Sequence, residues 1–278
     1  DKGADLRILN RGTKSSQPEQ LQYLGYRVFI TSYCYCRVCN GQLHRMTLPM
    51  DINKYKSHDK ILLAVDCIIF GFDGRQLQAL FIKRGFEPEK GKWSLMGGFV
   101  NKRESVNDAA SRVLNQLTGM TDIYMEQLNC FGDVGRDTAG RVVSVAYFAL
   151  INIAEYSEQL QHNHEARWFP LNKIPALIFD HKQMLHKAKE RLKEKVANHP
   201  IGFALLPRKF TLPQLQCLYE AIYGEPIDKR NFTRKILSLR ILNKLNEKEK
   251  ESSRKGAFYY VFDRQKYSKL EHEGMKFI

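Results

Sequence analysis

Hydrophobic and polar residues follow two periods along this chain, and the first of them predicts strands. Apolar residues crowd 61–72 and 77–84, on either side of the turn signal Asp73-Gly74, which predicts two strands joined by a hairpin. Further strands are predicted at 93–100, 125–134 and 141–153, with a turn at 135–140 and a strand or turn at 166–171. We therefore expect a mixed sheet that is packed by helices.

The second period predicts amphipathic helices on either side of the last strands. Apolar residues recur at helical spacing from 104 to 117 and stop at Gly119. A longer helix spans 180–198, where His199-Pro200 ends it. The order of strands and helices predicts an α+β protein, in which this long helix links two domains.

The C-terminal part predicts two short helices joined by a turn and followed by a wing. One helix spans 211–224 and the second spans 228–241, with Asp228 as its N-cap. A basic hairpin tip then precedes an apolar strand at 257–262, an order typical of a winged helix-turn-helix. Side chains expected to face outward and contact DNA phosphates or base edges are Lys229, Arg230, Asn231, Arg234, Lys235, Arg254 and Lys255.

The length of 278 residues fits about two domains on the usual prior of 100 to 200 residues each. We assign 58–199 to an effector-binding domain that ends in the linker helix 180–199, and 200–278 to a DNA-binding domain. Residues 1–57 are interpreted as an N-terminal extension from outside the natural protein. The reason is that no methionine precedes Met46 and the composition changes just after Met50.

The charge is uneven along the chain and adds a class of partner. Lys and Arg number 44 against 30 Asp and Glu, for a net charge of +14. Residues 201–278 hold 16 of the basic and 9 of the acidic residues, so that half of the excess lies in the predicted DNA-binding domain. A basic module of this kind is the electrostatic footprint of a nucleic-acid binder. An ordinary solvated basic face explains the charge about equally well.

Other function classes are disfavoured by what the chain lacks. No stretch has the roughly 18 apolar residues of a membrane span, and residues 1–20 are too polar for a signal peptide, so a cytoplasmic protein without a membrane partner is expected.

The six cysteines are then expected to be free thiols. Cys34, Cys36, Cys39 and His44 lie close together, but the spacing is cramped for zinc, and we expect no metal site there. Surface or capping positions are expected for His162, His164, His181 and His186.

One segment has a specific resemblance. Gly98, Glu104, Arg112 and Gly119-Met120 have the spacing of the Nudix box, and the flanking segments also resemble Nudix domains over about residues 58–180. The resemblance implies a mixed-sheet α/β/α sandwich. In the Nudix family, three further glutamates of the box hold divalent metal against a diphosphate.

The box departs from the family pattern at those three glutamates. Val113, Gln116 and Leu117 stand in their places, and none of them offers a carboxylate to Mg²⁺. Glu104 and Arg112 remain, and we interpret them as a structural pair. The prediction is a Nudix fold without hydrolase activity, catalytic residues, a bound metal or a cofactor.

A Nudix fold without its metal ligands can still keep a pocket. Cations there would meet phosphate, aromatic rings would stack on a base or sugar face, and carboxylates would accept sugar hydroxyl groups. Each of these residues taken singly is more often an exposed charge or a core aromatic. The residues expected to line the pocket are Lys83, Arg84, Phe86, Trp93, Arg136, Asp137, Arg141, Glu165 and Trp168.

A degenerate Nudix domain followed by a basic winged helix resembles the Nudix-related transcriptional regulators, the group that includes the NrtR and AraR types. The resemblance implies a homodimer that binds a palindromic operator in double-stranded DNA. It also implies a small effector, either an ADP-ribose-like nucleotide or a pentose such as arabinose, and control of sugar or cofactor metabolism genes.

Three alternatives stay open at the level of the sequence. The chain would be an active ADP-ribose or nucleoside-diphosphate pyrophosphatase if carboxylates outside the missing positions, such as Glu104, Glu126 and Glu165, recruit metal. It would be an RNA-binding or scaffolding protein if the basic module has another partner. The C-terminal module would be a small packing domain if its basic face is only solvated.

Overall fold

The structure is a computed structural model that describes residues 35–37, 43–45, 56–119, 121, 123–154, 166–250 and 255–272. The chain divides into two units, Asp1–Asp59 and Lys60–Ile278. In the first unit, β1 (Tyr35–Arg37) pairs antiparallel with β2 (Leu43–Arg45). Cys34 and Cys39 and the side chains of Cys36 and His44 lie outside the described part of the chain. None of the described helices is both long and apolar enough to cross a membrane.

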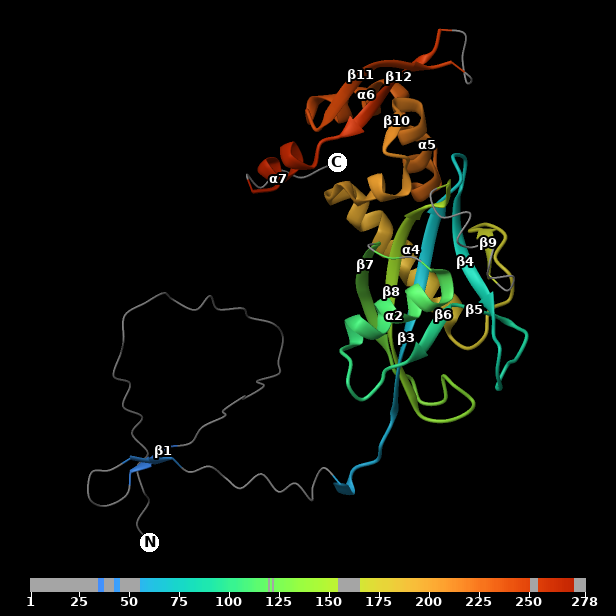
Figure 1. Ribbon diagram of the computed structural model, residues 1–278, viewed down its shortest axis with the longest axis vertical. Helices are drawn as coiled ribbons and strands as arrows, with labels where there is room; N and C mark the ends of the chain where they lie inside the picture. Colours follow the sequence, from blue (N-terminus) through green and yellow to red (C-terminus); the bar gives the residue numbers. More distant parts are fainter. Residues whose placement is uncertain are drawn as a thin grey trace. The chain divides into compact units, whose positions relative to one another are not determined.

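The second unit is built on a mixed seven-stranded sheet, which Figure 1 shows at its centre. Its strands are β3 (Leu62–Phe72), β4 (Leu77–Lys83), β5 (Trp93–Ser94), β6 (Met96–Phe99), β7 (Tyr124–Phe131), β8 (Val142–Asn152) and β9 (Ala166–Pro170). The main path runs β5-β4-β3-β8-β7, while β6 pairs with β3 and β9 pairs with β4. Only β3 and β8 are parallel, over eleven residue pairs, and the other pairings are antiparallel.

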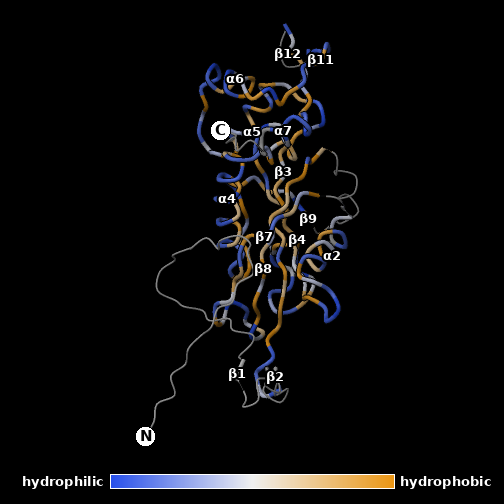
Figure 2. The backbone as a smooth tube through the Cα atoms, turned by 90° about the vertical axis from the view of Figure 1, so that its left-hand side faces the viewer, coloured by the Kyte–Doolittle hydropathy of each residue, from blue (hydrophilic) through white to orange (hydrophobic). Residues whose placement is uncertain are grey.

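Helices cover both faces of this sheet, as Figure 2 shows with α4 on one side and α2 on the other. Helix α2 (Val106–Thr118) packs on Cys67 and Ile69 of β3, whereas α4 (His181–Asn198) lies over Ile68 and Phe70. Because alternate side chains of a strand point to opposite faces, a strand between two helix layers is apolar throughout. The predicted α/β/α sandwich is confirmed.

The C-terminal part of the second unit is a winged helix. Its sheet has the order β10-β12-β11 and packs against α5 and α6. The elements are η1 (Pro200–Leu205), β10 (Lys209–Thr211), α5 (Leu212–Tyr223), α6 (Lys229–Ser238), β11 (Leu242–Glu249), β12 (Ala257–Phe262) and α7 (Arg264–His272).

The predicted starts of both short helices and the predicted end of the first are confirmed by their caps, whereas the second helix ends at Ser238 and not at 241. Thr211 and Gln214 form a capping box at the start of α5, and Gly224 ends the helix in the left-handed region, at a φ of 80°. Asp228 caps α6 by accepting a hydrogen bond from the backbone of Asn231. Phe232 and Ile236 of α6 are buried, as their spacing predicts.

Several short elements differ from the sequence prediction. The segment predicted as one strand at 93–100 is split into β5 and β6, which pair with different neighbours. The short strand β10, the 3-10 helix η1 and the terminal helix α7 were not expected. Such short elements have too few residues to show a period, and tertiary contacts select them.

The linker helix α4 joins the sheet to the winged helix through one apolar face. Met184 and Ala188 belong to the same buried cluster as the sheet residues beneath them, and the cluster continues into the core of the winged helix. Val196, at the other end of α4, is buried where Gly202 of η1 approaches it closely. The predicted boundary between 199 and 200 therefore falls inside a continuous core, and it remains a prediction as a domain boundary.

Candidate functional site

An open cavity lined by charged and apolar residues lies at one end of the sheet, where β3, β4 and β6 meet the first turn of α4. Its volume is about 270 Å³. Of the residues predicted to line a pocket, the structure brings five together around this cavity: Lys83, Arg84, Phe86, Arg136 and Asp137. Lining side chains that the sequence analysis did not select include Asp66, Ser94, Phe179 and His181.

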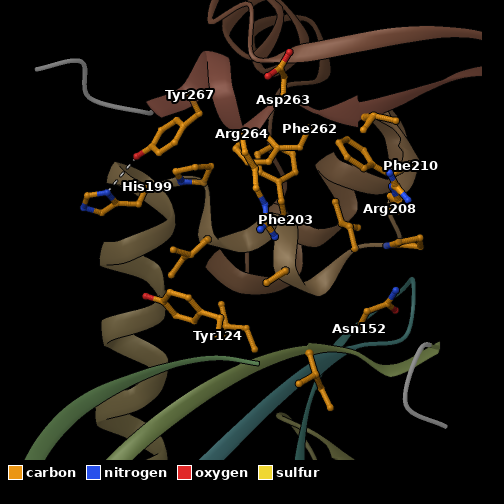
Figure 3. Close-up of a pocket in the computed structure, with 18 of the residues that line it drawn as sticks. Tyr124, Asn152, His199, Phe203, Arg208, Phe210, Phe262, Asp263, Arg264 and Tyr267 are labelled. Atoms are coloured by element: carbon orange, nitrogen blue, oxygen red, sulfur yellow. Dashed lines mark hydrogen bonds between the residues drawn. The ribbon is translucent and has the colours of Figure 1, made fainter. Parts of the chain in front are cut away.

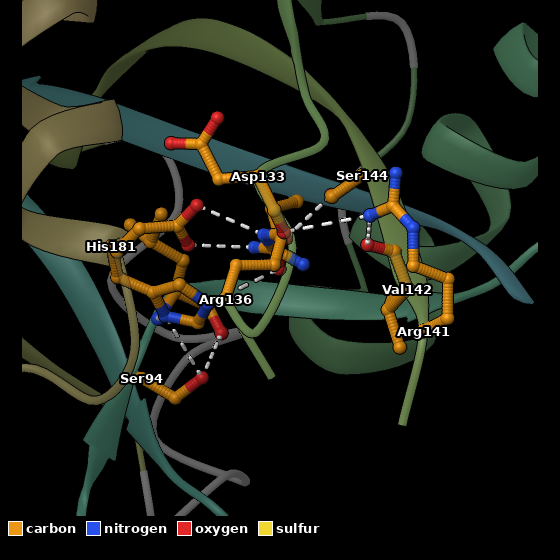
Figure 4. Close-up of polar contacts among 10 residues, drawn as sticks. Ser94, Asp133, Arg136, Arg141, Val142, Ser144 and His181 are labelled. Carbon is orange, nitrogen blue, oxygen red and sulfur yellow. Dashed lines mark hydrogen bonds and ion pairs between the residues drawn. The ribbon is translucent and has the colours of Figure 1, made fainter. Parts of the chain in front are cut away.

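Arg136 is at the centre of the polar wall of this cavity, as Figure 4 shows. Its guanidinium group donates from Nε and Nη2 to the two carboxylate oxygens of Asp180, at 2.8 and 2.7 Å. Its Nη2 atom also lies 3.6 Å from Asp66, and only 4% of the side chain is exposed. A two-pronged, buried ion pair of this kind holds both partners in one geometry. Because Asp180 is the N-cap residue of α4, Arg136 ties the start of that helix to the cavity wall.

Asp66 enters the cavity from the middle of β3. Its side chain is almost fully buried and accepts a hydrogen bond of 2.6 Å from the Ser144 hydroxyl group. Gly97 in β6 makes room for it, because a Cβ atom at that position would overlap the Asp66 Oδ1 atom. The carboxylate of Asp66 is thus held beside Arg136 by two neighbouring strands.

His181 corrects the expectation of a surface or capping histidine. It is buried, with 3% of its surface exposed, and it lines the cavity. The backbone N–H of Leu95 donates to its Nδ1 atom at 3.1 Å, so that this nitrogen accepts and any proton on the neutral ring sits on Nε2, which lies 3.8 Å from Asp66. Burial lowers the pKa of His181, although the nearby charges of Asp66 and Asp180 act to raise it.

The mouth of the cavity carries a guanidinium group beside two phenyl rings. The Arg84 guanidinium carbon lies 4.0 Å from the ring centre of Phe86 and 5.3 Å from that of Phe179. The Nε atom of Arg84 also donates to the Phe86 carbonyl group at 3.1 Å. Phe86 is 57% exposed, so its ring is accessible to a ligand. Planar cationic and aromatic surfaces at one mouth suit a ligand that carries both negative charge and a flat ring.

Three of the predicted pocket residues lie elsewhere, and a fourth is not described. Trp93 packs edge-on against Phe169 at 4.9 Å in the core cluster on the α4 face. Trp168 packs on Gly71 of β3 in the cluster on the α2 face. Arg141 points to backbone carbonyl groups of its own turn, 3.4 Å from that of Asp133. Glu165 lies outside the described residues.

Glu104 and Arg112 of the Nudix box form the structural pair that the sequence predicts. Arg112 donates to both carboxylate oxygens of Glu104, at 2.8 and 2.6 Å, and to the backbone carbonyl group of Phe99 at 2.9 Å. The hydrogen bonds from Arg112, followed by one from the Asn101 backbone, lower the pKa of Glu104 to about 2. These bonds fix the loop between β6 and α2.

The other box positions do not fit the divalent metal that the Nudix family uses. Val113 is buried on the sheet side of α2, where a Cβ atom at Gly98 would meet its Cγ2 atom at 2.8 Å. The Nη1 atom of Arg112 donates to the Gln116 Oε1 atom at 3.3 Å, so this oxygen is already hydrogen-bonded. The Leu117 side chain lies outside the described part of the structure. Among the described residues, no three His, Cys, Asp or Glu side chains are grouped to hold a metal ion.

Glu104 and Glu126, the two described carboxylates of the hydrolase alternative, do not come together in the structure. Glu126 of β7 lies on the α4 side of the sheet, 3.0 Å from Lys195 and 3.3 Å from Arg191. Glu104, in contrast, pairs with Arg112 of α2, which covers the other face. Two carboxylates on opposite faces of a sheet cannot share one metal ion.

The predicted DNA-contacting residues gather on the exposed side of α6. Lys229, Arg230, Asn231, Arg234 and Lys235 are all exposed, and the buried residues of the helix face the other way. Lys255 is exposed at the tip of the β11–β12 hairpin, and Arg254 lies outside the described residues. Lys244 and Lys248 of β11, which were not among the predicted residues, place their ammonium groups 3.6 and 4.5 Å from the ring centre of Phe258 on the same hairpin.

Fold and site together define a Nudix domain joined to a winged helix of the DNA-binding class, and comparisons with known proteins give the same division. Residues 60–190 match the NUDIX domain family, and residues 202–262 match the NrtR DNA-binding winged helix domain.

Two curated proteins are similar to this chain at the level of sequence. An ADPR responsive transcriptional repressor, NtrR of Acinetobacter baylyi, is 36% identical over 210 residues, which cover 74% of this chain and 84% of that protein. An ADP-ribose pyrophosphatase of Methanocaldococcus jannaschii is 33% identical over 135 residues, which cover 49% of this chain and 77% of that protein.

A solved structure extends the similarity to the whole two-part architecture. The crystal structure of Shewanella oneidensis NrtR, complexed with a 27mer DNA, matches with a TM-score of 0.67 and 32% identity, over 74% of this chain and 95% of that one. The chain belongs to the family of Nudix-related transcriptional regulators of the NrtR type.

The burial of His181 gives a testable pH dependence. Because its pKa is lowered from 6.5 in the folded protein, the unfolded chain binds this proton first, and the free energy of unfolding should fall as the pH drops through about 6.5. His181→Gln keeps an acceptor for the Leu95 N–H and should remove this part of the pH dependence. Urea unfolding on either side of pH 6.5 measures it, with His186→Gln on the exposed face of α4 as the matched control. Equal pH dependence in both variants would show that His181 is not the group responsible.

Proposed function

We propose that this chain is a DNA-binding transcriptional repressor whose cavity binds ADP-ribose or a closely related nucleotide, and that binding changes its affinity for operator DNA. The observation that carries the proposal is the single compact unit in which α4 connects the cationic, aromatic cavity to the winged helix and its exposed basic helix α6. The Acinetobacter relative, which is an ADPR responsive repressor, supports the choice of effector.

The DNA-binding part of the proposal rests on the chemistry of α6. Arg230 and Asn231 stand in its first turn, where a recognition helix presents side chains to the base edges of the major groove. Arg and Asn make two-pronged hydrogen bonds to guanine and adenine, whereas Lys229 and Lys235 suit phosphates. A homodimer would place two such helices on the half-sites of a palindromic operator.

The effector part rests on the mixture of groups around the cavity. Arg84 and Lys83 offer positive charge to a diphosphate, and the rings of Phe86 and Phe179 offer stacking surfaces to a base. Asp66 and Asp137 can accept hydrogen bonds from ribose hydroxyl groups. A free pentose such as arabinose would use only the carboxylates. The cations and aromatic rings therefore favour a nucleotide over a pentose.

We further propose that the cavity binds its ligand without hydrolysing it. Cleavage of a diphosphate by a Nudix enzyme depends on carboxylates that hold Mg²⁺, and Val113 occupies the core at one of those positions. The relative that is an ADP-ribose pyrophosphatase makes hydrolysis the second candidate.

Helix α4 offers a physical route from the cavity to the winged helix. Its first residue, His181, lines the cavity, and its N-cap residue Asp180 is held by Arg136. At the other end, Val196 is buried in the core that the winged helix shares. An anionic ligand that pairs with Arg136 would weaken the ion pair between Arg136 and Asp180. Because Asp180 is the N-cap of α4, this change would favour a different position of the helix.

The first test measures DNA binding and ligand response together. Duplex DNA from the region upstream of this protein's own gene should shift in a gel in the presence of random competitor DNA, and ADP-ribose should change that binding, whereas arabinose should not. The same tubes with Mg²⁺ should show no release of AMP from ADP-ribose. Absence of specific binding together with Mg²⁺-dependent cleavage would replace the repressor with a hydrolase, and a response to arabinose alone would replace the effector.

The recognition-helix assignment has its own test. Arg230→Ala and Asn231→Ala should each cost about 1 to 3 kcal/mol of binding free energy on the cognate duplex and little on random DNA. Lys255→Ala at the wing should weaken binding to both duplexes alike, because a phosphate contact carries no sequence information. Titrations by fluorescence anisotropy at one fixed salt concentration measure all three. If Arg230→Ala weakens both duplexes equally, α6 does not read bases.

The coupling through α4 is tested at its N-cap. Asp180→Asn keeps the shape of the side chain but removes the charge that binds Arg136, so operator DNA should still bind while the ADP-ribose-induced change in affinity falls several-fold. Glu190→Gln, on the exposed part of the same helix, is the matched control. DNA titrations with and without saturating ADP-ribose give the ratio for each variant, and identical ratios in the two variants would exclude the Arg136–Asp180 pair as the link.

A further inference from the structure

A second and larger cavity lies between the sheet and the winged helix, as Figure 3 shows. Its volume is about 1050 Å³, at the upper end of the range for small-molecule sites. Tyr124 and Asn152 line it from the ends of β7 and β8, and His199 lines it from the end of α4. The opposite wall consists of winged-helix residues, among them Arg208 and Arg264. None of the residues around the smaller cavity takes part in it.

The positively charged side chains that line this larger cavity outnumber its carboxylates. Arg208 and Arg264 are exposed, and neither side chain makes a hydrogen bond or an ion pair with any residue in the described part of the chain. Lys195 also lines the cavity, but its ammonium group is bound to Glu126 at 3.0 Å. Two arginines with unused donors favour a ligand that carries negative charge.

The one carboxylate that lines the described wall is already satisfied. Asp263 accepts hydrogen bonds of 3.0 Å from the Lys266 backbone and from the Asn243 side chain, and these bonds lower its pKa. The Lys266 ammonium group adds an ion pair at 3.4 Å. Asp263 therefore does not compete for the two arginines, and it caps α7, where Arg264 is the first residue.

Aromatic rings form the apolar side of the same cavity. Phe203 of η1 stacks on Phe262 of β12, with ring centres 4.4 Å apart and planes within 13° of parallel. Phe210 and Tyr267 extend the group, at 5.4 Å from Phe203 and 6.0 Å from Phe262. In Figure 3 the Arg264 side chain reaches from the start of α7 toward Phe203, so that guanidinium and aromatic groups face the same space. A planar ring that bears a phosphate group has both of the features that such a wall can recognise.

We propose that this cavity is a second small-molecule site that binds a mononucleotide, with the phosphate at Arg264 and the base against the aromatic group that includes Phe203 and Phe262. The site is distinct from the effector cavity and does not depend on its assignment. Because its walls come from the sheet and from the winged helix, a bound nucleotide contacts both and favours one arrangement of the two.

AMP is the probe for this site, and the full chain is titrated calorimetrically as the Arg84→Ala variant, which weakens the smaller cavity. ADP-ribose is left out, because it contains AMP and would compete for the proposed site. One AMP should bind per chain. Arg264→Ala should weaken AMP about tenfold, because it removes a charge-assisted contact with the phosphate, whereas Arg208→Ala should weaken it less. Arg103→Ala, an exposed arginine outside both cavities, is the matched control and should leave AMP binding unchanged.

Two further arms separate this site from the alternatives. Adenosine and inorganic phosphate should both bind more weakly than AMP, and equal binding by either would overturn the joint recognition of phosphate and base. Light-induced crosslinking with 8-azido-AMP should label peptides that contain Phe203 or Phe262. Labelling around Phe86 instead, loss of AMP binding in Arg84→Ala but not in Arg264→Ala, or no binding of AMP at all would each overturn the proposal.

Discussion

The apolar face of α4 is the constraint on which the rest of this structure depends. One helix must bury Met184 and Ala188 against a sheet and Val196 against a winged helix at the same time, so the two parts share a core. Burial of the Met184 and Val196 side chains contributes about 1.5 to 3 kcal/mol each, which is more than exposed ion pairs provide. Movement at one end of α4 therefore changes packing at the other end. A regulator that reports a bound ligand to DNA needs this kind of connection.

The chemistry at this end of the sheet follows from which residues of the Nudix box are present and which differ from the family pattern. The pair of Glu104 and Arg112 still fixes the loop before α2, which keeps Gly97 and Gly98 close to their neighbours. Val113, in contrast, is buried in the core at a position where the Nudix family has a carboxylate that binds a hard cation. The fold has thus retained its cavity while the described part of the metal-binding face has become packing. This arrangement is the basis of our proposal that the cavity binds its ligand without cleaving it.

Much of the fold could be predicted because its signals are local. The two-sided burial of β3 appears in the sequence as an apolar run that only Asp66 interrupts, and Thr211, Gly224 and Asp228 set helix ends through hydrogen bonds and backbone conformations within a few residues. The cavity was predicted less completely. Trp93 and Trp168 have the residue type of ligand-stacking aromatics, but they lie in the core, where most large aromatic residues are found. Residue type alone does not distinguish the two roles.

The sequence by itself determined the order of strands and helices, the family resemblance and the basic exposed side of α6, because periodicity, capping residues and motif spacing act over short stretches of chain. Only the tertiary structure decided that Asp66, Arg136 and His181, which come from three distant segments, share one buried cavity. It also decided that Arg208 and Arg264 face a second cavity beside stacked phenylalanines. Contacts between distant segments depend on how the strands and helices pack, and no local pattern in the sequence records that packing.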